Sequence, residues 1–107
     1  MAAVRYLVDD VGAAVDFYVD QLGFAVREDW GPVVILERAD LELWLSGPES
    51  SAGRHPVQGN RFVVQVADLD RALDDLGATP EIVDGAAGRW AIVADPAGNP
   101  VELFEVP

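Results

Sequence analysis

The chain has 107 residues, half of them hydrophobic, which suffices for one domain and leaves too little for a second core. Its 19 acidic residues against 7 Lys and Arg give a formal net charge of -12. A surface this acidic repels phosphate backbones and anionic lipids, so we expect no nucleic-acid partner and no membrane partner. The absence of cysteine excludes disulfides, thiol nucleophiles and cysteine-ligated metals.

No stretch of the sequence approaches the roughly 18 apolar residues that a membrane helix needs. The first ten residues reach Asp9 and Asp10 without a long apolar core, unlike a signal peptide. There is also no low-complexity tract. We therefore expect a cytoplasmic protein that is folded along its whole length.

The first 23 residues predict a strand followed by a helix. Residues 3–8 alternate between two kinds of side chain, as in a strand with two different faces. Asp10 stands where a helix N-cap belongs, because its carboxylate can accept from free amides of the first turn. Apolar residues then recur at helical spacing up to Leu22, and Gly23 can adopt the left-handed conformation of a C-cap.

Three β-rich runs follow, at 24–28, 32–37 and 41–46. Residues 38–40 form a tight connection between the last two runs, so we expect an antiparallel meander. Residues 47–59 are rich in Gly, Pro and Ser and show no apolar period, which is typical of a linker.

The second half repeats this order. Residues 62–66 form a strand pattern, Asp68 stands at a helix N-cap, and a helical apolar face ends at Gly77. The remaining strand patterns lie at 81–83, 90–94 and 101–106.

Equivalent residues of the two halves can be aligned along the chain. Asp10 and Asp68 differ by 58 positions, whereas Glu42 and Glu102 differ by 60. This repetition predicts a duplicated βαβββ unit, with one module at 1–46, a linker at 47–59 and a second module at 60–107, in a single domain spanning 1–107.

Five motifs occur in a defined order: VDDV (8–11), DFY (16–18), LGF (22–24), VADL (66–69) and DPAGNPVEL (95–103). Together they resemble the glyoxalase, bleomycin-resistance and extradiol-dioxygenase superfamily, also called vicinal oxygen chelate proteins. The resemblance implies an α+β fold in which two βαβββ modules form a cupped, barrel-like mixed sheet around a ligand site, with helices outside. It also implies that the site is commonly completed by dimerisation, so we expect a homodimer.

Strand alternation sorts the side chains of the sheet into two faces, of which the more apolar one should meet the helices. The other face should line the cup. Trp90 is a further candidate wall residue, although both faces of its strand are partly apolar. The predicted ligand-binding residues are Arg5, Glu42, Trp44, Arg61, Gln65, Trp90, Glu102 and Phe104, beside Ala3, Leu7 and Val63.

In metal-dependent members of the family, the resemblance places the ligands at four positions, which here are Ala3, Glu42, Arg61 and Glu102. Ala3 has no donor atom, and an arginine cannot be deprotonated at any useful pH and would repel a cation. The only histidine, His55, lies in the expected linker and is interpreted as a surface residue. We therefore predict no metal of the family's usual kind and no other cofactor; a divalent metal is disfavoured rather than excluded.

Without a metal, Glu42 and Glu102 have two interpretations. In the structural one, each pairs with Arg5 or Arg61, because a buried carboxylate needs a partner. In the functional one, this Arg/Glu set, framed by aromatic side chains such as Trp44, binds a small organic molecule that is cationic or aromatic. Both can hold in one site.

Two tryptophans call for separate interpretations. Trp44 shares a strand face with Glu42, so its burial is expected to require a ligand or a partner subunit. Trp30, beside a turn at Gly31, is interpreted as a lid or dimer contact.

Three functions remain open from the sequence. The first is metal-independent binding of a small molecule, similar to bleomycin-resistance proteins, in which an antibiotic or metabolite is sequestered. The alternative is a lyase, isomerase or dioxygenase-type enzyme that uses Glu42 and Glu102 as acid and base or as metal ligands. The third is an accessory domain in which the charged residues only lock the sheet.

Overall fold

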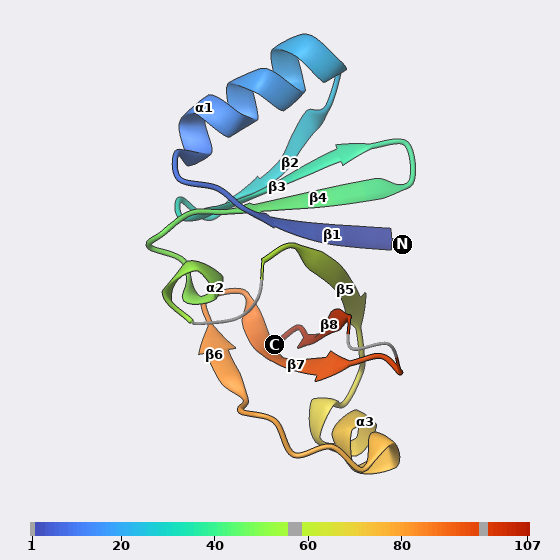
Figure 1. Cartoon of the computed structure of the whole chain (residues 1–107). Helices are drawn as coiled ribbons and strands as arrows, with labels where there is room; N and C mark the ends of the chain where they lie inside the picture. Colours follow the sequence, from blue (N-terminus) through green and yellow to red (C-terminus); the bar gives the residue numbers. More distant parts are fainter. Residues whose placement is uncertain (1, 56–58, 97–98) are drawn as a thin grey trace.

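The computed structural model describes residues 2–55, 59–96 and 99–107. Its strands form one eight-stranded mixed sheet in the order β2-β3-β4-β1-β5-β8-β7-β6. The sheet is curled, and α1 and α3 lie on its outer side at opposite ends of the molecule (Figure 1). The predicted α+β fold with a cupped sheet and outer helices is confirmed.

The first half begins with β1, which leads into a helix capped by Asp10, whose side chain accepts from Ala13 N–H as predicted. The expected helix to Leu22 becomes a π-helical turn in its second part, where Tyr18 packs edge-on against Phe17 and Phe24. The elements are β1 (Ala2–Leu7), α1 (Val11–Asp16), η1 (Phe17–Gln21), β2 (Ala25–Asp29), β3 (Val33–Arg38) and β4 (Leu41–Ser46).

In the second half, Asp68 caps α3 through Arg71 N–H, and Gly77 ends the helix at a φ of 65°, both as predicted. The sixth strand lies two residues later than expected, and the seventh begins two residues earlier, because they pair as a hairpin around residues 85–88. The elements are β5 (Arg61–Gln65), α3 (Leu69–Leu76), β6 (Val83–Gly85), β7 (Gly88–Ala94) and β8 (Pro100–Glu105).

The expected linker at 47–59 contains a short packed helix, α2 (Ser51–Arg54), which the sequence pattern does not predict. Ser50 caps it by accepting from Gly53 N–H, and Ala52 is fully buried. A side chain at Gly53 would collide with the backbone of Gly47, so the segment folds back on itself and packs closely. Residues 56–58 of this linker, and residues 97 and 98 of the predicted turn, lie outside the described residues.

The two halves meet where β1 pairs antiparallel with β5, and each of these strands also pairs in parallel with the last strand of its own half, β4 or β8. When the two halves are aligned by their helix caps, Asp10 and Asp68, the strand register aligns Glu102 with a residue other than Glu42. Arg5 lies opposite Trp44, and Val63, 58 positions after Arg5, lies opposite Glu102. The structural equivalent of Glu102 is therefore Trp44.

Three apolar clusters hold the fold together. One packs α1 against the outer face of β3 and β4 around Leu36 and Leu45, and another packs α3 against β7 and β8 around Leu69 and Ala91. The third lies inside the cup and includes Trp90. No helix in the described part of the chain is both long and apolar enough to cross a bilayer.

Candidate functional site

The concave side of the sheet encloses a cavity of about 630 Å³, a volume in the range of small-molecule sites. Its walls come from both halves of the chain, from α2 and from the β6–β7 turn. Six of the eight predicted ligand-binding residues line it: Arg5, Glu42, Trp44, Gln65, Trp90 and Phe104. The other two, Arg61 and Glu102, are buried and do not line the cavity.

Strand register explains how these side chains meet on one face. Arg5 lies between Trp44 of β4 and Arg61 of β5, so three inward side chains from three adjacent strands form one row. Trp90 lies opposite Phe104. Only 1% of Trp90 is exposed, and it belongs to the cluster inside the cup, which places its side chain on the inner face.

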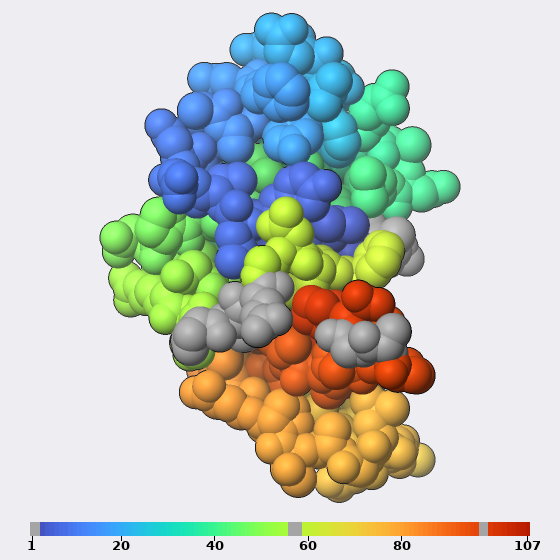
Figure 2. Space-filling model, in the orientation of Figure 1, coloured from blue at the N-terminus to red at the C-terminus, as the bar shows by residue number. Residues whose placement is uncertain are grey.

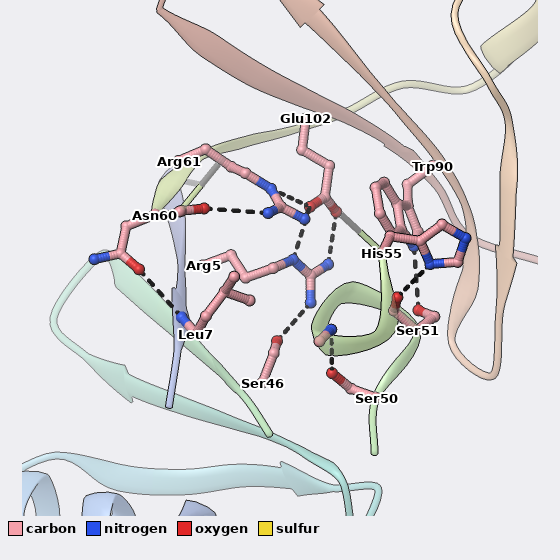
Figure 3. A network of polar contacts seen from close by, with 12 residues as sticks. Arg5, Leu7, Ser46, Ser50, Ser51, His55, Asn60, Arg61, Trp90 and Glu102 are labelled. Carbon is pink, nitrogen blue, oxygen red and sulfur yellow. Dashed lines mark hydrogen bonds and ion pairs between the residues drawn. The ribbon is translucent and has the colours of Figure 1, made fainter. Parts of the chain in front are cut away.

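A buried ion network joins the lining of the cavity at Arg5, and Figure 3 shows its contacts. Arg5 donates from Nε and Nη2 to the two oxygens of Glu102 at 2.7 and 2.6 Å, a bidentate pair. Arg61 donates from Nε and Nη2 to Glu102 Oε1 at 3.0 and 2.9 Å. Arg5 Nη1 also donates to Ser46 Oγ at 2.7 Å. The network thus contains two guanidinium groups and one carboxylate.

The formal charge of Arg5, Arg61 and Glu102 together is +1, and their exposed fractions are 3%, 4% and 0%. Burial lowers the pKa of Arg61 from its ordinary value; Glu102 opposes this, and the nearby charge of Arg5 adds to it. An arginine nevertheless stays protonated at physiological pH. Arg5, the member of this network that lines the cavity, therefore belongs to a group of buried side chains with excess positive charge.

Glu42 has partners that differ from those expected. Its Oε1 accepts from Trp44 Nε1 at 2.8 Å, and its Oε2 pairs with Arg27 of β2. The prediction that Glu42 pairs with Arg5 or Arg61 was therefore wrong, whereas it holds for Glu102. Strand alternation gave no signal for Arg27, because β2 has a bulge there: Val26 lies opposite Leu36 and Glu28 opposite Ile35, and Arg27 and Glu28 both line the cavity.

Aromatic rings surround the guanidinium of Arg5. Its Cζ lies 5.1 Å from the ring centre of Trp44 and 6.0 Å from that of Trp90. Phe104 meets Trp44 edge to face at 4.9 Å. Contacts within the chain therefore bury Trp44 to 3% exposure, so the expectation that its burial needs a ligand or a partner subunit was wrong.

The rim of the cavity includes residues outside the eight predicted ligand-binding positions. Trp30 lines it while 47% exposed, and its Nε1 donates to Glu28. Ser51 of α2 accepts from Trp90 Nε1 at 3.2 Å. His55, expected at the surface, is half-buried with its ring edge against Trp90.

The donor set does not suit a divalent metal. Among the described residues, no group of three or more His, Cys, Asp or Glu side chains is arranged to hold one. Both oxygens of Glu102 already accept from guanidinium groups. Ala3 offers no donor, and Arg61 lies at the other position that the resemblance assigns to a ligand.

The hydrogen bonds and ion pairs of the site also argue against acid–base and nucleophilic catalysis. Glu42 and Glu102 would each have to break an ion pair before exchanging a proton with a substrate. His55 Nδ1 contacts the backbone oxygen of Ser51 at 2.6 Å, while the hydroxyl of Ser51 accepts from Trp90. His55 therefore does not activate Ser51 as a nucleophile in this arrangement.

Comparison with protein families decides the family of the chain. The family Glyoxalase/Bleomycin resistance protein/Dioxygenase superfamily matches residues 1–103. The chain belongs to this superfamily. The predicted membership is confirmed, and the paired βαβββ order of this glyoxalase-like chain agrees with it.

Solved structures with the same fold cover nearly the whole glyoxalase-like chain. A superfamily member from Vibrio splendidus shares 20% identity with a TM-score of 0.66, over 98% of this chain and 97% of the other. Methylmalonyl-CoA epimerase from Mycobacterium tuberculosis shares 22% identity with a TM-score of 0.65, over 98% and 86%. A protein from Legionella pneumophila, described as an NAD-dependent benzaldehyde dehydrogenase, shares 17% identity with a TM-score of 0.73 over both full chains.

Structural similarity at such low sequence identity establishes a shared fold only. The reaction or ligand therefore has to be inferred from the residues of the site. A search of curated proteins found no match to the chain.

Proposed function

We propose that this glyoxalase-like protein binds a small organic molecule without a metal and sequesters it, as an antibiotic-binding or metabolite-binding protein would. The observation that carries the proposal is the cavity of about 630 Å³. Trp44, Trp90 and Phe104 line it, and Arg5 and Glu42, which also line it, have hydrogen-bond partners within the chain. Pockets that combine apolar aromatic walls with a few fixed polar groups are typical of small-molecule sites.

The metal-independent part of the proposal rests on Glu102 and Arg61. A metal that used Glu102 would have to displace two guanidinium groups from the carboxylate and then lie beside their positive charge. Ala3 could contribute nothing in return. The same ion pairs weigh against a lyase, isomerase or dioxygenase that relies on Glu42 and Glu102.

We also propose that the protein is a homodimer. The outer face of the central strands exposes large apolar side chains: Phe62 is 64%, Val64 46% and Tyr6 37% exposed. Figure 2 shows the segment of β5 (yellow-green) at the surface between the N-terminal residues and the last strand. Contiguous apolar surface of this kind is typical of protein interfaces.

A dye titration tests the binding function. Nile red, a neutral aromatic dye that becomes fluorescent in apolar sites, should bind with one saturable site per chain. Its affinity should be the same in EDTA and in added Mn²⁺ or Zn²⁺. Absence of saturable binding both of this dye and of the smaller aromatic probes described below, or loss of binding in EDTA, would contradict the proposal.

A matched pair of variants locates the dye. Ala87 lines the cavity at the β6–β7 turn, so Ala87→Trp should fill part of it and weaken Nile red binding. Ala13 is exposed on α1, so Ala13→Trp adds the same side chain outside the cavity and should leave binding unchanged. Equal affinity in both variants would place the dye elsewhere.

A further inference from the structure

The charges around the cavity are arranged by depth. Glu28, Glu49 and Asp84 lie at the exposed rim, where water and salt weaken their fields. Arg5 forms part of the floor and is 97% shielded from solvent, since only 3% of it is exposed. Charges in such a shielded site are screened far less than charges at the rim.

Arg5 retains hydrogen-bonding capacity toward the cavity. A guanidinium group carries five N–H bonds. Three of those on Arg5 are used: Nε and Nη2 each donate to Glu102, and Nη1 donates to Ser46. One N–H on Nη1 and one on Nη2 thus have no acceptor within the described chain, on the two nitrogens that together can hold a carboxylate.

The carboxylates of Glu42 and Glu102 are already balanced. Glu42 is neutralised by Arg27, and Glu102 is shared between Arg5 and Arg61. A cationic ligand would have to displace an arginine to reach either carboxylate. An anion at Arg5 would instead neutralise the +1 charge of the buried network and satisfy its remaining donors.

We propose that the cavity takes a flat aromatic molecule bearing a carboxylate, with the carboxylate on Arg5 and the ring system against the aromatic wall of Trp44, Trp90 and Phe104. This rests on the proposed function and specifies the ligand class of the same site. The anionic head group replaces the cationic one that the sequence suggested, because Glu42 and Glu102 both have arginine partners.

The indole signals of the protein provide a direct test. All three tryptophans, Trp30, Trp44 and Trp90, line the cavity, so each indole N–H signal in a ¹⁵N-correlated NMR spectrum reports on it. The probes are 2-naphthoate, its neutral isostere 2-naphthamide and the cation 2-naphthylmethylammonium, at neutral pH. We expect 2-naphthoate to shift the Trp44 and Trp90 signals and to bind at least about tenfold more tightly than either other probe.

Two variants connect this preference to Arg5. Arg5→Gln should remove the preference for 2-naphthoate over 2-naphthamide, whereas Arg71→Gln on the exposed face of α3 should retain it. If Arg5→Gln fails to fold, the comparison of the three probes on the unmodified protein still decides whether the cavity prefers a carboxylate.

The outcomes separate the two proposals. Equal or tighter binding of 2-naphthamide or of the ammonium probe overturns the carboxylate inference and leaves the binding function standing. If Nile red binds but no naphthyl probe binds, the carboxylate inference is likewise overturned and the binding function stands. If neither Nile red nor any naphthyl probe binds, the proposed function itself fails.

Discussion

Replacing Glu102 with glutamine tests the buried ion network most sharply. Glu102 accepts four hydrogen bonds from Arg5 and Arg61, and its side chain is fully buried. Glutamine keeps the size of the side chain but removes its charge, and turns one acceptor into an NH₂ group that faces guanidinium donors. Two buried positive charges then lie together without a counterion.

The expected loss of stability is large because Arg5, Arg61 and Glu102 are all buried. Breaking a buried ion pair by removing one member lowers the free energy of unfolding by about 3–5 kcal/mol. Domains of this kind have total stabilities of about 5–15 kcal/mol. We therefore expect Glu102→Gln to lose a large part of the stability, with the urea midpoint reduced by more than about 1 M.

Glu42→Gln is the matched control. Glu42 is also buried, but the side chain of its partner Arg27 is 41% exposed and can regain water when the pair is lost. A glutamine oxygen can still accept from Trp44 Nε1. We expect a loss of about 1 kcal/mol or less. Urea unfolding followed by tryptophan fluorescence and circular dichroism measures both variants, and equal midpoints would refute the reasoning.

Two further predictions concern other parts of the fold. Gly88→Ala should lower stability by about 1–3 kcal/mol in thermal unfolding, because a Cβ there would collide with the backbone of Glu105 and the ring of Phe104, and because φ is 151°; an unchanged melting temperature would contradict this. The pKa of Glu105 is lowered by the backbone N–H of Leu69 and then by Arg89, so its stabilising effect is complete above its usual value of 4.5 and is lost as the pH falls through the folded-state value. The stability difference between the unmodified protein and Glu105→Gln, measured by urea unfolding across pH, should therefore be constant near neutrality and shrink at acidic pH; a difference that does not change with pH at all would contradict the assignment.

Local sequence signals predicted most of the fold. Alternation defined the two faces of the strands, and the caps at Asp10, Asp68 and Gly77 lie where the sequence placed them. The helix α2 was missed because its four residues carry no apolar period, and contacts with Gly47 and the Ser50 cap hold it. Such contacts depend on the tertiary fold and leave no local pattern.

The sequence predicted the strand face on which each site residue lies, but not the ion-pair partner of each charged residue. A shift of two residues in strand pairing leaves every side chain on its own face, so alternation cannot distinguish the alignment of Glu102 with Glu42 from its alignment with Trp44. The actual register, together with the reach of Arg27 from the edge strand β2, determines which arginine meets which glutamate. Those contacts form only in the curled sheet, so the sequence pattern does not reveal them.

Metal-independent ligand binding can be tested by native mass spectrometry of the protein as purified, without chelator and from medium that supplies zinc and manganese. It reports bound metal, retained small molecules and subunit number together. We expect a dimer of 11.5 kDa chains without stoichiometric metal, which gains one naphthoate per chain when that probe is added. A stoichiometric divalent metal that is lost in Glu102→Gln would contradict it.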